Sequence, residues 1–181
     1  MALKSLRKIF SHRLSVLAPL LALALTGCIT STREILGDAK AILGERIQVH
    51  AFTTAKNGTR EHTTGIFEWS GSRYVRRSGD FTDFTIFPYE GRDLIIQTQT
   101  SRGSTTIQFG LARRIAEGVY LILPIQDEDA DQPTRERFCT KTQGSDCRIS
   151  TPEQLFVFAR ASAARDEDNG GVAVVVAAPR R

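Results

Sequence analysis

The stretch Thr105-Thr-Ile-Gln-Phe-Gly-Leu111, with Val119-Tyr-Leu-Ile-Leu-Pro-Ile125 shortly after it, determines the fold class. In the first segment apolar side chains alternate with Gln108 and Gly110, a period of two residues that indicates a β-strand with one buried face. The second segment is apolar on both faces, so we expect it to lie centrally in a sheet or beneath another element. Glu117-Gly118 between them is typical of a short turn.

Similar short runs rich in Thr, Ile, Val, Phe and Tyr flank this pair, and Gly, Ser, Asp or Asn separate them. The further predicted strands span residues 48–54, 65–69, 73–77, 84–88, 94–100 and 172–177. Nearly every connector contains glycine, and Asn57-Gly58 is a strong hairpin signal. Strands about ten residues apart with short turns predict an antiparallel meander and not a parallel α/β sheet.

One helix is predicted after the strands, over residues 152–164. Thr151 stands at its N-cap, Pro152 at its first position and Gln154 at its third, which is the pattern of a capping box. Its buried face would carry Leu155, Phe158, Ala159 and Ser162. The fold class is therefore mainly β: a small antiparallel barrel or sandwich of about 7–8 strands with one packed C-terminal helix. Residues 47–178 form this single domain.

The chain begins with a basic and then apolar leader. Four basic residues and no acid precede an apolar run over residues 14–25. A membrane-spanning helix needs about 20 apolar residues, so this run is short for a permanent anchor. Its charge order and length are those of a secretory signal peptide, which we assign to residues 1–27.

Leu25-Thr26-Gly27-Cys28 follows the apolar run directly. This element resembles the lipobox of bacterial lipoprotein precursors, in which the cysteine is lipidated and becomes the new N-terminus. The alternatives are an ordinary secretory signal or a membrane helix that happens to contain a cysteine. The resemblance implies lipidation of Cys28 and a membrane anchor of several acyl chains. Because Ile29 and not Asp follows the cysteine, it also implies the outer membrane, with the protein facing the periplasm.

Removal of the leader changes the charge balance of the chain. The full chain has 24 Lys and Arg against 20 Asp and Glu, and the four basic residues before Cys28 leave 20 of each in the mature chain. Nucleic-acid binding requires an excess of basic charge, so we expect no nucleic-acid partner.

Residues 28–46 are predicted to form a lipidated tether. Ile35, Leu36, Ala39, Ile42 and Leu43 fall at helical spacing and suggest a short helix within it. Residues 179–181 form a tail.

Cys139 and Cys147 are the two cysteines that remain in an exported chain. Because the cell envelope is oxidising, they predict a disulfide. A metal site is the alternative, and it would need ligands from His50 or His62, which are distant in sequence.

Catalytic and metal-binding motifs are weak. Asp127, Asp129 and Asp131 have the spacing of the first three ligands of an EF-hand calcium loop. Gln132 and Phe138, however, occupy the positions where that loop needs glycine and glutamate. A solvated acidic loop is the preferred interpretation. No motif of a known nucleophile or metalloprotease is found in the sequence. We therefore expect no catalytic residue, no metal and no cofactor.

Aromatic residues between positions 67 and 89 are interleaved with arginines. They predict either the core of a small β domain or a ligand surface that includes Trp69, Tyr74, Arg76 and Tyr89. The expected function is that of a non-enzymatic envelope lipoprotein whose β domain binds another protein, a polysaccharide or another envelope component. A small-molecule-binding barrel is the first alternative and a hydrolase without a recognisable motif is the second. A large apolar cavity would favour the barrel alternative.

Overall fold

The computed structural model describes residues 28–54, 58–79, 82–99, 105–141, 146–165 and 170–178 of the 181-residue chain. The predictions for the leader, for the Asn57-Gly58 turn and for the tail lie wholly or partly outside these residues. No helix in the described part of the chain is long and apolar enough to span a bilayer.

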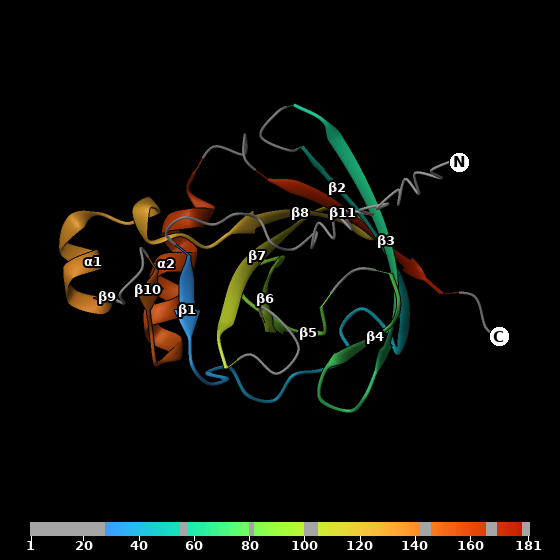
Figure 1. Cartoon of the computed structure of the whole chain (residues 1–181), viewed down its shortest axis with the longest axis horizontal. Coiled ribbons are helices and arrows are strands. Elements are labelled where there is room, and N and C mark those ends of the chain that lie inside the picture. The colour runs from blue at the N-terminus through green and yellow to red at the C-terminus, as the bar shows by residue number, and fades with distance from the viewer. Residues whose placement is uncertain are drawn as a thin grey trace, which may run out of the picture.

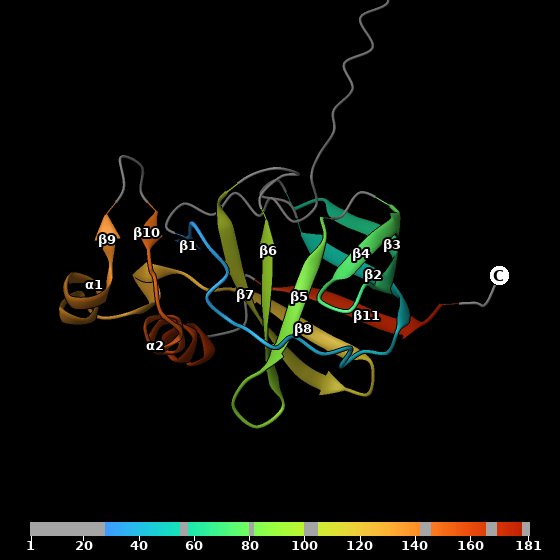
Figure 2. The same ribbon diagram turned by 90° about the horizontal axis from the view of Figure 1, so that it is seen from below.

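Eight antiparallel strands form a closed barrel (Figures 1 and 2). The barrel strands are β2 (Arg46–Thr54), β3 (Arg60–Trp69), β4 (Tyr74–Ser78), β5 (Phe84–Pro88), β6 (Asp93–Gln99), β7 (Ile107–Ala116), β8 (Val119–Pro124) and β11 (Gly171–Ala177). Their order around the barrel is β6-β5-β4-β3-β2-β11-β8-β7, and pairing of β6 with β7 closes it. The prediction of a mainly β fold is confirmed, and of the two architectures considered the fold is the barrel.

Strand β8 has two buried faces because it separates two cores. Tyr120 and Ile122 point into the barrel interior, while Leu121 and Leu123 belong to a second core outside the barrel wall. Helix α2 (Pro152–Ala163) covers that outer face and packs on β7 and β8. Figure 1 shows α2 beside the barrel wall. The prediction that this strand is covered by another element is confirmed.

Helix α2 begins at the predicted capping box. The Thr151 hydroxyl accepts from the Gln154 N–H, and the Gln154 side chain accepts from the Thr151 N–H at 3.1 Å. Leu155, Phe158, Ala159 and Ser162 form the buried face, as predicted.

Several short elements were not predicted from the sequence. Strand β1 (Ile29–Ser31) pairs with β7 on one side and with β10 (Cys147–Arg148) on the other, and β10 pairs with β9 (Thr140–Lys141). A 3-10 turn η1 (Asp127–Asp129) and helix α1 (Gln132–Phe138) follow β8. The predicted tether therefore begins inside the fold, since Ile29 is fully buried in the core beneath α2.

The prediction of a helix within residues 28–46 is wrong. After β1 this segment crosses the outside of the barrel without helical structure before it enters β2 (Figure 2). Its apolar side chains are divided between the two cores: Ile35 and Leu36 pack beneath α2, whereas Leu43 packs on the barrel core. Asp38 has a φ of 55°, a left-handed conformation that a helix does not contain.

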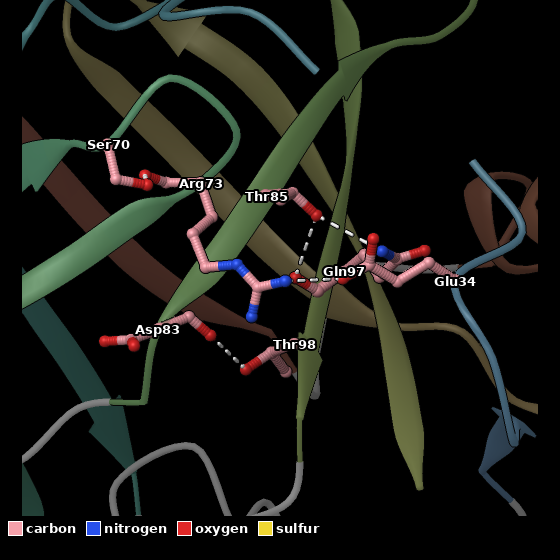
Figure 3. A network of polar contacts seen from close by, with 7 residues as sticks. All are labelled: Glu34, Ser70, Arg73, Asp83, Thr85, Gln97 and Thr98. Atoms are coloured by element: carbon pink, nitrogen blue, oxygen red, sulfur yellow. Dashed lines mark hydrogen bonds and ion pairs between the residues drawn. The ribbon is translucent and has the colours of Figure 1, made fainter. Parts of the chain in front are cut away.

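A polar network fastens this crossing segment to the barrel wall (Figure 3). Glu34 forms an ion pair with Arg73 at 2.8 Å, beside two buried polar side chains on the outer face of β5 and β6. These are Thr85 and Gln97, whose side chains contact each other at 3.4 Å. The Gln97 amide donates to the Thr85 hydroxyl, which donates to the Gln97 carbonyl at 3.4 Å, so these two polar side chains bond to each other where the segment crosses the wall.

Candidate functional site: an apolar cavity inside the barrel

The barrel contains a cavity of about 100 Å³ that is partly open to solvent and is lined almost entirely by apolar side chains. Its wall is built by the inward-facing residues of alternate positions along the strands, since successive side chains in a strand point to opposite faces. Representative lining residues are Val49 on β2, Phe67 on β3, Ile86 on β5, Ile96 on β6, Ala112 on β7 and Ile122 on β8. The cavity belongs to the barrel alone, because α2 packs on the opposite face of the wall.

One end of the barrel is closed by the turn that leads into β2. The Tyr74 hydroxyl accepts from the Leu43 N–H at 2.9 Å and donates to the Gly44 carbonyl at 3.1 Å. Leu43 itself lines the cavity, and Trp69 packs edge-on against Tyr74 with ring centroids 5.1 Å apart. Burial raises the pKa of the Tyr74 hydroxyl, so this group stays neutral and keeps both hydrogen bonds.

The lining at the other end of the barrel contains hydroxyl groups. Thr53, Thr82 and Thr98 contribute to the lining there, and the hydroxyls of Thr82 and Thr98 lie 2.7 Å apart. The Thr98 hydroxyl also donates to the Asp83 carbonyl at 3.0 Å. The cavity is therefore apolar along its length, with a small number of hydroxyl groups at this end.

The volume of the cavity limits the shape of a ligand. An engineered apolar cavity of about 150 Å³ in another protein accommodates benzene. A cavity of about 100 Å³ is smaller than that one and has no polar group along its middle. Without rearrangement it accepts a narrow apolar chain and not a fused ring system.

The residues predicted to form a ligand surface do not lie together. Trp69 and Tyr74 contact each other at the closed end, where Tyr74 is fully buried. Tyr89 lies against Phe156 of α2, and its hydroxyl donates to the Phe156 carbonyl. Arg76 is exposed on β4, and its backbone N–H donates to Asp83. Part of the aromatic cluster therefore belongs to the core and not to the surface. The alternation of apolar Phe67 with polar Glu68 in the sequence indicated this.

Cys28, the proposed lipidation site, is 2% exposed and pairs with Gln126 through a single β-bridge. Burial, followed by the carboxylates of Asp146, Asp127 and Glu128, raises the pKa of its thiol to about 12. A free Cys28 thiol in this position is protonated at neutral pH and therefore a poor nucleophile.

Cys139 and Cys147 form a disulfide with a Cα–Cα distance of 5.1 Å. Cys139 caps the C-terminus of α1, and Cys147 lies in β10, which pairs with β1 and β9. The predicted disulfide is thus present, and it attaches α1 to the small sheet that starts at residue 29.

The acidic segment after β8 is structured, so its interpretation as a solvated loop is wrong. Asp127 is buried, and Asp129 accepts from the Ser162 hydroxyl at 2.6 Å and pairs with Arg165 at 3.0 Å. Asp131 caps α1 by accepting from the Thr134 N–H. The Asp129 carboxylate holds α2 and Arg165 just after it, and the Asp131 carboxylate caps α1. These carboxylates do not converge on a common point as calcium ligands would.

His50 and His62 lie next to each other on the outer face of β2 and β3, with the Thr64 hydroxyl beside both. They are distant in sequence but adjacent through strand pairing, since Phe52 pairs with His62 and His50 with Thr64. From the sequence they were considered as ligands of a metal site with the distant Cys139 and Cys147.

Comparison of the chain with protein-family models, with curated proteins and with solved structures found no match. The function is therefore inferred from the cavity and from the sequence.

Proposed function

We propose that this protein is a lipid-anchored binding protein of the bacterial cell envelope that holds the apolar chain of a small amphiphile inside its barrel. The apolar cavity of about 100 Å³ carries this proposal. The surface that the sequence suggested for a protein or polysaccharide partner has no comparable support, because Trp69, Tyr74 and Tyr89 are largely part of the packing of the domain.

The ligand class follows from the chemistry of the lining. The middle of the cavity offers only apolar contact, so a buried polar group there would lose its hydrogen bonds to water without replacement. The hydroxyls of Thr82 and Thr98 at one end can hydrogen-bond a polar head group. A single unbranched alkyl chain with a neutral or anionic head group fits both features.

The affinity is expected to depend on chain length. Burial of each methylene contributes about 0.8 kcal/mol, which corresponds to about a fourfold gain in affinity. The gain must end when the cavity is full, and further methylenes then remain in water. A series of n-alkyl ligands should therefore show rising affinity followed by a plateau.

The anchor is proposed from the lipobox alone. A diacylglycerol on the Cys28 sulfur requires that this side chain leave its buried position. The Cys28 backbone is held by the bridge to Gln126 and by its carbonyl, which accepts from the Cys147 N–H at 3.2 Å. Ile29 would remain in β1, paired with Cys147. The lipid would then emerge directly beside the domain, with no free tether between the membrane surface and β1.

The binding proposal is tested by titrating the mature protein with n-alkyl carboxylates and n-alkanols of increasing length and measuring each affinity by calorimetry. The single tryptophan, Trp69, lies at the closed end and provides a fluorescence readout. We expect about a fourfold gain per methylene and then a plateau. Affinity that rises without a plateau would indicate micelle or surface adsorption, and absence of saturable binding would refute the proposal.

The anchor is tested separately by Cys28→Ala in the full-length chain expressed in a Gram-negative host. We expect unprocessed, unlipidated precursor, detected by mass spectrometry. A mature, membrane-bound product from this variant would show that the anchor lies elsewhere, and this result would leave the cavity proposal untouched.

A further inference from the structure

The geometry points to a zinc-binding site on the outer face of the barrel, formed by His50 of β2 and His62 of β3 with Thr64 beside them. The His50 Nδ1 and His62 Nε2 atoms are 3.3 Å apart. The Thr64 Oγ1 atom lies 3.4 Å from the His50 nitrogen and 3.5 Å from the His62 nitrogen. Three potential donor atoms therefore form a nearly equilateral triangle.

The size of this triangle matches one face of a tetrahedral zinc site. Two nitrogens bound to tetrahedral Zn²⁺ at 2.0–2.1 Å lie about 3.3–3.4 Å from each other. Two neighbouring nitrogens in a square-planar site with similar bond lengths lie only about 2.8–3.0 Å apart. The observed nitrogen–nitrogen distance thus fits the tetrahedral geometry that zinc prefers.

The nitrogen–nitrogen contact is within hydrogen-bonding distance, so one imidazole can donate to the other when no metal is bound. The rings are nearly parallel, with an angle of 12° between them, and the Phe52 ring stacks on His62 at a centroid distance of 4.5 Å. This stacking holds the His62 ring in place and so reduces the entropy lost on metal binding.

Strand pairing sets the relative positions of the two histidines. His50 pairs with Thr64 and Phe52 pairs with His62, so the histidines are diagonal neighbours on the same face of an antiparallel pair. No group of three or more His, Cys, Asp or Glu side chains that could hold a metal is found among the described residues. The affinity must therefore come from two imidazoles, with the neutral Thr64 hydroxyl as a weak third donor and water completing the shell.

The chain is favourable for testing this site, because His50 and His62 are the only histidines after residue 28. The test is calorimetric titration of the mature protein with Zn²⁺, with the disulfide intact and Cys28 blocked. We expect one Zn²⁺ per chain and at least a tenfold loss of affinity in each of His50→Ala and His62→Ala. Gln48→Ala, on the same outer face of β2, should leave the affinity unchanged.

A variant that adds a metal ligand tests the site without relying only on loss of Zn²⁺ affinity. Thr64→His adds a third imidazole beside the two histidines, and we expect at least a tenfold tighter Zn²⁺ affinity. Zn²⁺ should also shift the NMR signals of both imidazole rings together. Absence of one-to-one binding in the wild type, or equal affinity in His50→Ala and the wild type, would overturn the proposal. Circular dichroism of each variant establishes that it is folded.

Discussion

At the scale of single residues, Tyr74 connects the barrel to the segment that precedes it. Its ring is fully buried among Trp69 and Phe84, and its hydroxyl bonds to the backbone of Leu43 and Gly44. The phenol thus supplies both apolar packing inside the barrel and two hydrogen bonds that hold the closing turn. The sequence marked Tyr74 as a ligand-surface candidate because a pattern of aromatics and arginines does not distinguish a capping residue from a contact residue.

Tyr74→Phe removes the hydroxyl but keeps the ring. The Leu43 N–H and the Gly44 carbonyl then lose a partner, so we expect the free energy of unfolding to fall by about 1–2 kcal/mol. Tyr89→Phe is the matched control: it removes one hydrogen bond from a half-buried tyrosine and should cost less. Denaturant unfolding measures both values, and an equal or larger effect at Tyr89 would contradict this role of Tyr74.

The same hydroxyl predicts a pH dependence. Burial raises the folded-state pKa of Tyr74 above its ordinary value of 10.0. Its contribution to stability is therefore fully present below pH 10 and is lost as the pH rises from there through the folded pKa, because the unfolded chain ionises first. We expect the stability of the wild type to fall more steeply above pH 10 than that of Tyr74→Phe. Parallel pH profiles for the two proteins would refute this expectation.

At the scale of elements, the disulfide determines how firmly α1 is held. The Cys139–Cys147 bond joins the end of α1 to β10, and Cys147 is paired with Ile29 of β1. The Gln154 side chain adds a hydrogen bond from α2 to the Phe138 carbonyl. These short elements contain few apolar residues of their own, so the covalent link is expected to provide much of their stability.

Replacement of both cysteines by serine should lower the free energy of unfolding by about 2.6 kcal/mol, the loop-closure value for a ring of this size. Because Cys147 is fully buried, Cys139→Ala with Cys147→Ala serves as a control that avoids a buried hydroxyl. Chemical denaturation of the oxidised wild type and both variants provides the measurement. Unchanged stability in the alanine pair would show that the disulfide does not hold this region.

Elements with a long, regular pattern could be predicted from the sequence, and short ones could not. The strand at Phe84–Pro88 and the helix from Pro152 were placed correctly because alternation and capping are local properties. Strands β1, β9 and β10 have two or three residues each, too few to show a period. The helix expected near Ile35 is absent because its apolar residues serve two separate cores, which only the tertiary structure defines.

The candidate site could be predicted only in part, for the same reason. The sequence showed that both faces of the Val119–Pro124 strand are apolar, but it could not show that one face lines a cavity and the other contacts a helix. His50 and His62 were recognised individually. Their adjacency depends on the register of β2 and β3, which local sequence did not fix.

At the scale of the whole molecule, the fold places an apolar interior inside the barrel and a second core outside it. Packing of α2 on β7 and β8 leaves the barrel interior available, because the helix covers the outer face of the wall. Closure between β6 and β7 removes the open sheet edge that an eight-strand sheet would otherwise expose. The molecule is thus organised as a closed barrel with a helix packed on its outer wall, and we propose that an apolar chain binds inside this barrel.

The most direct test of this claim is the affinity of one n-alkyl carboxylate, chosen at the plateau of the chain-length series, for the wild type and for Ala112→Leu. Ala112 is buried and lines the cavity, so the added carbons should occupy the ligand volume. Ala116→Leu, at the exposed end of the same strand, is the matched control. We expect at least tenfold weaker binding for Ala112→Leu, with the fold retained, and unchanged binding for the control. Equal affinity of the wild type and Ala112→Leu would contradict it.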